Sequence, residues 1–167
     1  MKRAFTSAFL VTALMVVASV SAPAQGPSVS FASPALITLR AGADGGLELP
    51  FRVATGYHIN SHRPHEEYLI QTELKLEPPS GVMVSKVDYP EGRDLTFPFA
   101  PDEKLSVYTG DFSVGVKVHA LPKTSPGKYT MKGVLRFQAC DNRACYPPKT
   151  TAVEIDVNVA PPAAATR

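Results

Sequence analysis

The feature that most constrains the fold of this chain is an alternation of apolar and polar residues with a period of two. Three runs show it plainly, at residues 47–53, 112–118 and 153–159. Successive side chains of a β-strand point to opposite faces, so this period is typical of strands with one buried and one solvated face. No stretch carries an apolar stripe at helical spacing. The sequence therefore predicts an all-β protein.

Shorter candidate strands and turn signals complete the pattern. Clusters of glycine, proline and serine separate the runs, for example at residues 78–81 and 125–127. Seven or more short antiparallel strands with such turns between them predict a two-sheet β-sandwich, in a Greek-key arrangement rather than a barrel. The further strands are expected at residues 36–40, 72–77, 82–88 and 129–139.

The N-terminus has the composition of a secretory leader. Lys2 and Arg3 precede a short apolar run, and small residues up to Ala24 follow it. The run is shorter than a membrane span needs, and no second candidate span follows, so export to the periplasm is expected. The predicted parts are a signal peptide, one folded domain and a flexible C-terminal tail, over residues 1–24, 25–159 and 160–167.

The charge balance excludes a strong electrostatic partner. The sequence has 17 basic and 15 acidic residues, and loss of Lys2 and Arg3 with the leader makes the two numbers equal. A domain without net charge gives no reason to expect nucleic acid or an anionic membrane as its partner.

Two cysteines, Cys140 and Cys145, carry the most informative chemistry. Four turn-forming residues separate them, so a hairpin loop would place them opposite each other on antiparallel arms. Their Cα atoms would then lie about 4.5–5.5 Å apart, which permits a disulfide. Pro147 and Pro148 remove two backbone donors from the returning arm, so we expect the pair at an accessible sheet edge.

Spacing alone leaves two interpretations of this disulfide open. A structural bridge is common in exported proteins, and the chain would then be a non-catalytic module that binds a protein or a metal. A ring of about six residues stabilises the fold by only roughly 2 kcal/mol, however, whereas a bridge across a hundred residues approaches about 5 kcal/mol. Short exposed disulfides also exchange readily, which favours a redox-active pair.

The residues around the pair resemble a known active-site motif. The run from Phe137 to Thr150, in which Tyr146, Pro147 and Pro148 follow Cys145, resembles the signature of the N-terminal periplasmic domain of the thiol:disulfide interchange protein DsbD. Weaker matches in the same order extend the resemblance over most of the chain. They lie at residues 56–60, 72–74, 89–92 and 107–108.

This resemblance implies an immunoglobulin-like sandwich that acts as a protein-disulfide reductase. The pair would pass electrons through a reversible disulfide, without a cofactor, to periplasmic thiol-disulfide proteins such as disulfide isomerases or thioredoxin-like proteins. By position, Cys145 would form the mixed disulfide and Cys140 would resolve it. The chain ends after the sandwich, so a separate membrane electron donor is expected. The best-known member has five residues between its cysteines, where this chain has four.

A cap over the cysteines is a further implication of the resemblance. Residues 90–104 lack a strand pattern and are expected to form a long irregular loop, of which residues 97–104 would shield the pair. An aromatic ring from Phe97 or Phe99 would cover the sulfurs. Further candidate cap or partner contacts are Asp102, Glu103 and Tyr146.

Three histidines within eight residues, His58, His62 and His65, could form a copper or zinc site. No cysteine or methionine lies nearby in the sequence, and Pro64 interrupts any regular face. We therefore favour loop histidines on a solvated surface over metal ligands.

Overall fold

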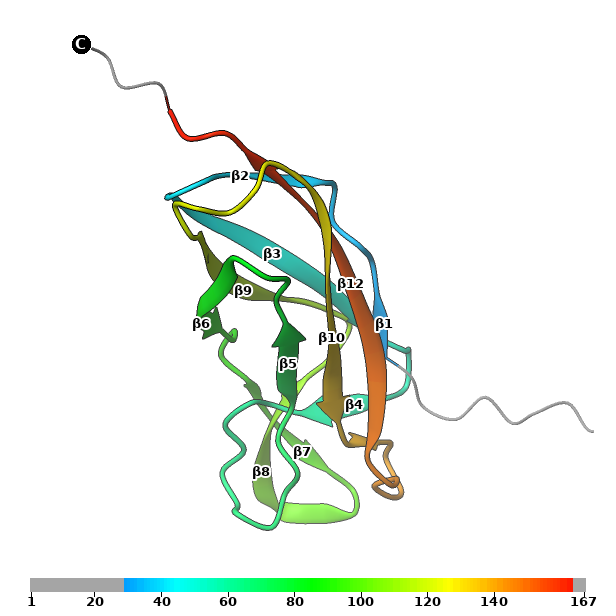
Figure 1. The fold of residues 1–167 in the computed structure, drawn as a ribbon. Helices are drawn as coiled ribbons and strands as arrows, with labels where there is room; N and C mark the ends of the chain where they lie inside the picture. The colour runs from blue at the N-terminus through cyan, green and yellow to red at the C-terminus, as the bar shows by residue number, and fades with distance from the viewer. Residues whose placement is uncertain (1–28, 164–167) are drawn as a thin grey trace, which may run out of the picture.

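The computed structural model describes residues 29–163, and in that part of the chain it contains strands and no helix. Figure 1 shows two layers of long strands with a smaller group of strands at one end. The elements are β1 (Val29–Phe31), β2 (Ile37–Arg40), β3 (Asp44–Val53), β4 (His58–Asn60), β5 (Glu73–Glu77), β6 (Val82–Asp88), β7 (Arg93–Phe97), β8 (Ala100–Tyr108), β9 (Asp111–Ala120), β10 (Gly127–Phe137), β11 (Ala139–Cys140) and β12 (Lys149–Ala160).

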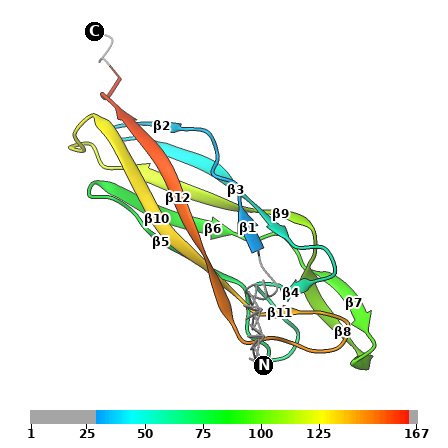
Figure 2. The same ribbon diagram turned by 90° about the vertical axis from the view of Figure 1, so that its right-hand side faces the viewer.

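The two long layers form a sandwich. One sheet has the strand order β1-β3-β9-β6 and the other the order β2-β12-β10-β5 (Figures 1 and 2). Neighbours in these sheets are antiparallel, except that β2 pairs parallel with β12. The prediction of an immunoglobulin-like all-β sandwich is confirmed, and the expectation of antiparallel pairing alone is wrong at β2.

The period-two alternation fills the space between the two sheets. Apolar residues at alternate positions of β3, β9, β10 and β12 are buried, and their neighbours point to solvent. Burial of this apolar surface is the main favourable term in folding. The side chains without exposed surface include Leu49, Val114, Val118, Met131, Leu135, Val153 and Ile155.

A third, smaller sheet with the order β11-β4-β8-β7 lies at one end of the sandwich (Figure 2). Residues 90–104 were expected to form an irregular loop, but most of them belong to the hairpin β7–β8. Pro98 lies in its turn, and Pro101 lies where the register shifts, so neither proline interrupts a regular ladder. The prolines of this segment thus caused strands β7 and β8 to be missed in the sequence.

The chain boundaries differ slightly from expectation. β12 continues to Ala160, which pairs with Arg40, so the last strand reaches one residue into the predicted tail. The predicted signal peptide, residues 1–24, lies outside the described residues. Between residues 29 and 163, there is no helix with the length and apolar character needed to span a membrane.

Candidate functional site

The site is a disulfide hairpin at the edge of the small sheet. Cys140 ends β11, and Cys145 pairs with it as an antiparallel bridge. Two backbone hydrogen bonds flank the pair, from Asp141 N to Ala144 O and from Tyr146 N to Ala139 O. This makes the cysteines a non-hydrogen-bonded pair, the closer of the two antiparallel spacings. Their sulfurs are bonded, so the predicted hairpin disulfide is confirmed. Their Cα atoms lie 3.9 Å apart, which is closer than the spacing expected from the sequence.

The two cysteines differ in exposure. Cys140 has no exposed surface and lies on β11, which pairs edge to edge with β4, whereas Cys145 is exposed on the returning arm. The prediction of an accessible pair at a sheet edge therefore holds for Cys145 and is wrong for Cys140. A partner can reach only one of the two residues without a rearrangement.

Asp141 holds the four-residue loop in shape. Its carboxylate accepts hydrogen bonds from Arg143 N at 2.7 Å, from Ala144 N at 2.9 Å and from the Tyr146 hydroxyl at 2.7 Å. These three hydrogen bonds lower the pKa of Asp141 to about 2, and the bond from the Tyr146 hydroxyl contributes most. The sequence signal for this role is an aspartate at the start of a tight turn, where its side chain accepts from the backbone two residues on.

Tyr146 makes contacts with Tyr57 and with the hairpin loop. Its ring meets Tyr57 edge-on at 6.0 Å between centroids, and its hydroxyl donates to Asp141. Its carbonyl accepts a hydrogen bond from Gln138 Nε2 at 3.2 Å. Tyr146 thus connects the returning arm to the loop and to residue 138.

His58 lies directly opposite Cys140 in the pairing of β4 with β11. It is only 2% exposed, and the Phe97 ring stacks on it with centroids 3.7 Å apart. Burial lowers the pKa of His58 to about 4, and the charge of Asp141 opposes this shift in part. The expectation of a solvated loop histidine is wrong here, because all three residues of β4 are buried, so both faces of this short strand are covered.

A groove of about 480 Å³ opens beside Cys145. The tip of the β7–β8 hairpin forms one wall through Phe99, Asp102 and Glu103. Tyr68, which the sequence did not single out, also lines the groove, and its hydroxyl donates to Glu103 Oε2 at 3.1 Å. The structure thus brings three of the expected cap residues to the exposed cysteine. Phe97 stacks on His58 instead.

The remaining histidines have protein partners. His62 stacks on Tyr89 with centroids 3.6 Å apart, and its Nδ1 lies 2.9 Å from the carbonyl of Thr72. His65 Nε2 lies 2.8 Å from Asp94 Oδ1. Among residues 29–163, no cluster of three or more potential metal ligands is found.

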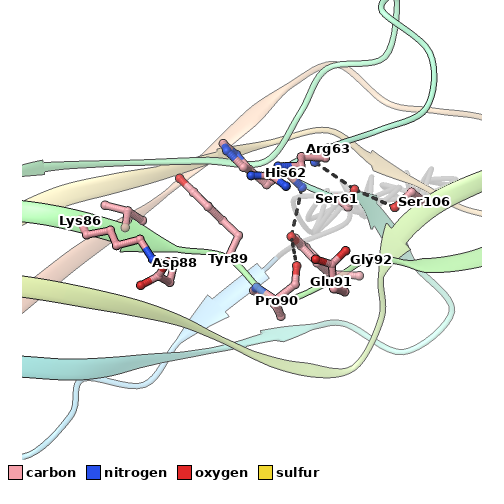
Figure 3. A pocket seen from close by; sticks show the side chains of 12 residues that line it. Ser61, His62, Arg63, Lys86, Asp88, Tyr89, Pro90, Glu91, Gly92 and Ser106 are labelled. Carbon is pink, nitrogen blue, oxygen red and sulfur yellow. Dashed lines mark hydrogen bonds and ion pairs between the residues drawn. The ribbon is translucent and has the colours of Figure 1, made fainter.

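The base of the β7–β8 hairpin is fastened to the sandwich around a second cavity, of about 340 Å³ (Figure 3). The buried Tyr108 hydroxyl donates to Pro90 O at 2.9 Å and accepts from His62 N at 3.1 Å. The hydroxyls of Ser61 and Ser106 lie 2.9 Å apart and are hydrogen-bonded, and a dashed line marks this bond in Figure 3. Neither cysteine lines this cavity. This second cavity therefore lies at the base of the β7–β8 hairpin. The tip of the hairpin borders the other groove, beside Cys145.

Fold and site together define a β-sandwich domain with a disulfide hairpin at one end. A family model described as the N-terminal domain of thiol:disulfide interchange protein DsbD matches residues 31–157. The chain therefore belongs to this family, which confirms the resemblance seen in the sequence.

Solved structures are similar at a lower level. The N-terminal periplasmic domain of ScsB from Proteus mirabilis is 15% identical with a TM-score of 0.45, and the match covers 78% of this chain and 44% of that chain. The seventh ScaB type I cohesin from Pseudobacteroides cellulosolvens is 12% identical with a TM-score of 0.49, over 83% and 95% of the two chains. No curated protein sequence matches. The family assignment rests on the family model.

Proposed function

We propose that this domain is a periplasmic protein-disulfide reductase that exchanges a reversible Cys140–Cys145 disulfide with partner proteins. The observation that carries the proposal is the difference in exposure between the two cysteines. Cys145 is exposed beside a groove, whereas Cys140 is fully buried. Exchange needs access for one attacking sulfur and a second sulfur that reacts only with the first, and this arrangement supplies both.

The reaction starts from the reduced pair. The Cys145 thiolate attacks one sulfur of a partner disulfide, and the other partner sulfur leaves as a thiolate and takes up a proton. The Cys140 thiol then loses its proton and attacks the Cys145 sulfur. This attack releases the second partner sulfur, which takes up the proton. Two electrons pass to the partner, and the domain is left with its disulfide. The step needs no cofactor besides the cysteines.

The partners follow from this chemistry. The acceptor is an oxidised periplasmic thiol-disulfide protein that presents its disulfide to the groove lined by Phe99, Asp102 and Glu103. The oxidised domain is then reduced by a separate membrane-bound electron donor. Export through the leader at residues 1–24 would place the domain in the compartment where disulfides persist.

Trapping of mixed disulfides tests the proposal. Cys140→Ser leaves Cys145 unable to release an adduct, so this variant should accumulate mixed disulfides with periplasmic proteins on a non-reducing gel. Cys145→Ser leaves only the buried cysteine and should trap far fewer. The double variant is the control for non-covalent association. Equal and negligible trapping by both single variants would favour a purely structural disulfide.

A further inference from the structure

The strand pairing at the site contains a buried polar group that the exchange reaction described above does not use. His58 and Cys140 occupy directly opposite positions of β4 and β11. Side chains at opposite positions lie on the same face, with Cβ atoms about 4.5–5.5 Å apart. An imidazole ring at one position is therefore within reach of a sulfur at the other.

In the disulfide form, this imidazole lacks a partner. His58 Nε2 is buried and makes no hydrogen bond, although the ring is held in place by stacking on Phe97. A buried donor or acceptor without a partner is costly, and native proteins rarely leave one unexplained. The sulfur of Cys140 is bonded to Cys145 in this state and carries no hydrogen to donate.

Reduction changes what Cys140 can offer. Each cysteine gains one electron and one proton, so Cys140 becomes a buried thiol that can donate, or a thiolate that can accept. A neutral imidazole can serve either form, because one ring nitrogen accepts and the other donates. Burial keeps His58 neutral at pH 7, since its pKa is lowered to about 4, with the nearby charge of Asp141 opposing the shift only in part.

We propose that His58 is a positioning residue that hydrogen-bonds the Cys140 sulfur in the reduced domain and is left unpaired in the disulfide. The bond stabilises the reduced form relative to the oxidised form, so it makes the disulfide easier to reduce. This inference rests on the proposed function for its use, since it concerns how readily the same pair accepts electrons from a donor.

The equilibrium of the full-length protein with glutathione measures this directly. His58→Phe keeps a ring that can stack on Phe97 but removes both nitrogens. We expect its disulfide to be favoured about tenfold more than in the wild type, which corresponds to a reduction potential about 30 mV more negative for this two-electron couple. His58→Gln keeps a donor and an acceptor near the position of Nε2 and should stay close to the wild-type value.

The matched control is His65→Phe, the same replacement at an exposed histidine that contacts Asp94 and lies away from the cysteines. It should leave the equilibrium with glutathione unchanged. An unchanged equilibrium in His58→Phe, or an equal shift in His58→Phe and His58→Gln, would overturn the inference.

A second measurement on the wild-type protein does not depend on how the variants fold. The ¹⁵N chemical shifts of the His58 ring, recorded by NMR, should change when the disulfide is reduced, because Nε2 gains a hydrogen-bond partner. Identical ring shifts in the two redox states would overturn the inference and leave the trapping result intact. A disulfide that resists both glutathione and dithiothreitol would overturn the proposed function as well.

Discussion

The sandwich body and the disulfide end of this domain bury different kinds of residue. Between the two large sheets the buried side chains are almost all aliphatic or aromatic, as at Leu49 and Ile155. At the disulfide end the buried residues include His58, Asn60 and Ser61. Of the residues described, only His58 Nε2 and Asn60 Oδ1 are buried polar side-chain atoms without a hydrogen-bond partner, and both belong to β4.

This difference separates stability from reactivity within one domain. Apolar packing stabilises the body whichever redox state the cysteines adopt. Polar groups and a hairpin tip at the other end can respond when a sulfur changes its bonding, at a cost in local stability. Substitutions in the two regions should therefore change different measured quantities.

The largest expected effect is on stability, from a core truncation in the body. Phe51 is 2% exposed and packs between the rings of Phe31 and Phe112, at centroid distances of 5.2 and 5.4 Å. Phe51→Ala should lower the free energy of unfolding by about 3–5 kcal/mol in urea titrations. The equilibrium of the disulfide with glutathione should not change, provided that it is measured where the variant is folded.

The matched replacement at the other end is Phe99→Ala, at a ring that is 37% exposed. It should lower the free energy of unfolding by less than about 1 kcal/mol. Equal losses from Phe51→Ala and Phe99→Ala would show that the hairpin tip contributes to stability as the body does.

A second prediction concerns pH. The pKa of His58 is lowered to about 4 in the folded protein and is about 6.5 when the chain is unfolded, so the unfolded state binds more protons between these values. The stability that depends on the neutral ring is complete above about pH 6.5 and is lost as the pH falls towards 4. The loss should be on the order of 2 kcal/mol. Urea titrations at pH 7 and pH 4.5 should show it in the wild type, and the loss should be smaller in His58→Phe.

The loop anchor gives a third prediction. Asp141→Ala removes the acceptor for Arg143 N, Ala144 N and the Tyr146 hydroxyl, so the two thiols of the reduced domain should approach each other less often. The equilibrium with glutathione should shift a few-fold towards the dithiol, and Asp141→Asn should lie between. The difference between the wild type and Asp141→Ala should be complete above about pH 4, where the carboxyl is charged. It should disappear as the pH falls towards 2, the lowered pKa of Asp141.

The control for this anchor is Glu154→Ala, which removes an exposed carboxylate from the middle of β12. An equal shift in this variant would assign the effect to net charge and not to the loop.

The smallest expected effect is on the rate at which a small reductant reaches the disulfide. Phe99 and Cys145 line the same groove. Phe99→Ala should speed reduction of the disulfide by dithiothreitol by about a factor of three, because access limits exchange. Val134→Ala is the matched control, since Val134 is 38% exposed and lies on β10 of the body. An unchanged rate in Phe99→Ala would show that the Phe99 ring does not shield the disulfide.

The body of the fold was predictable because its signal is local and periodic. Strands β3, β9 and β12 were expected from alternation, and the expected strand at residues 82–88 coincides with β6. The single expected strand at residues 129–139 is two, since Gln138 separates β10 from β11. Hairpin β7–β8 was missed because its prolines lie at a turn and at a register shift, which a sequence cannot distinguish from loop.

The site was predictable only in part, for a related reason. The disulfide followed from two cysteines and a short turn, which are close in the sequence. The pairing of His58 with Cys140 joins residues 82 positions apart, and the burial of His58 depends on Phe97 from a third segment. No local pattern encodes such a meeting of segments, so the histidine was misassigned to the surface.

The course of β12 has a practical consequence. This strand begins shortly after the disulfide hairpin and runs to the opposite end of the sandwich, where Ala160 ends it (Figure 1). Twelve residues of extended chain span about 36 Å. A biotin or an affinity handle attached beyond Ala160 would therefore orient immobilised molecules with the disulfide hairpin away from the support, which would leave Cys145 open to the solution.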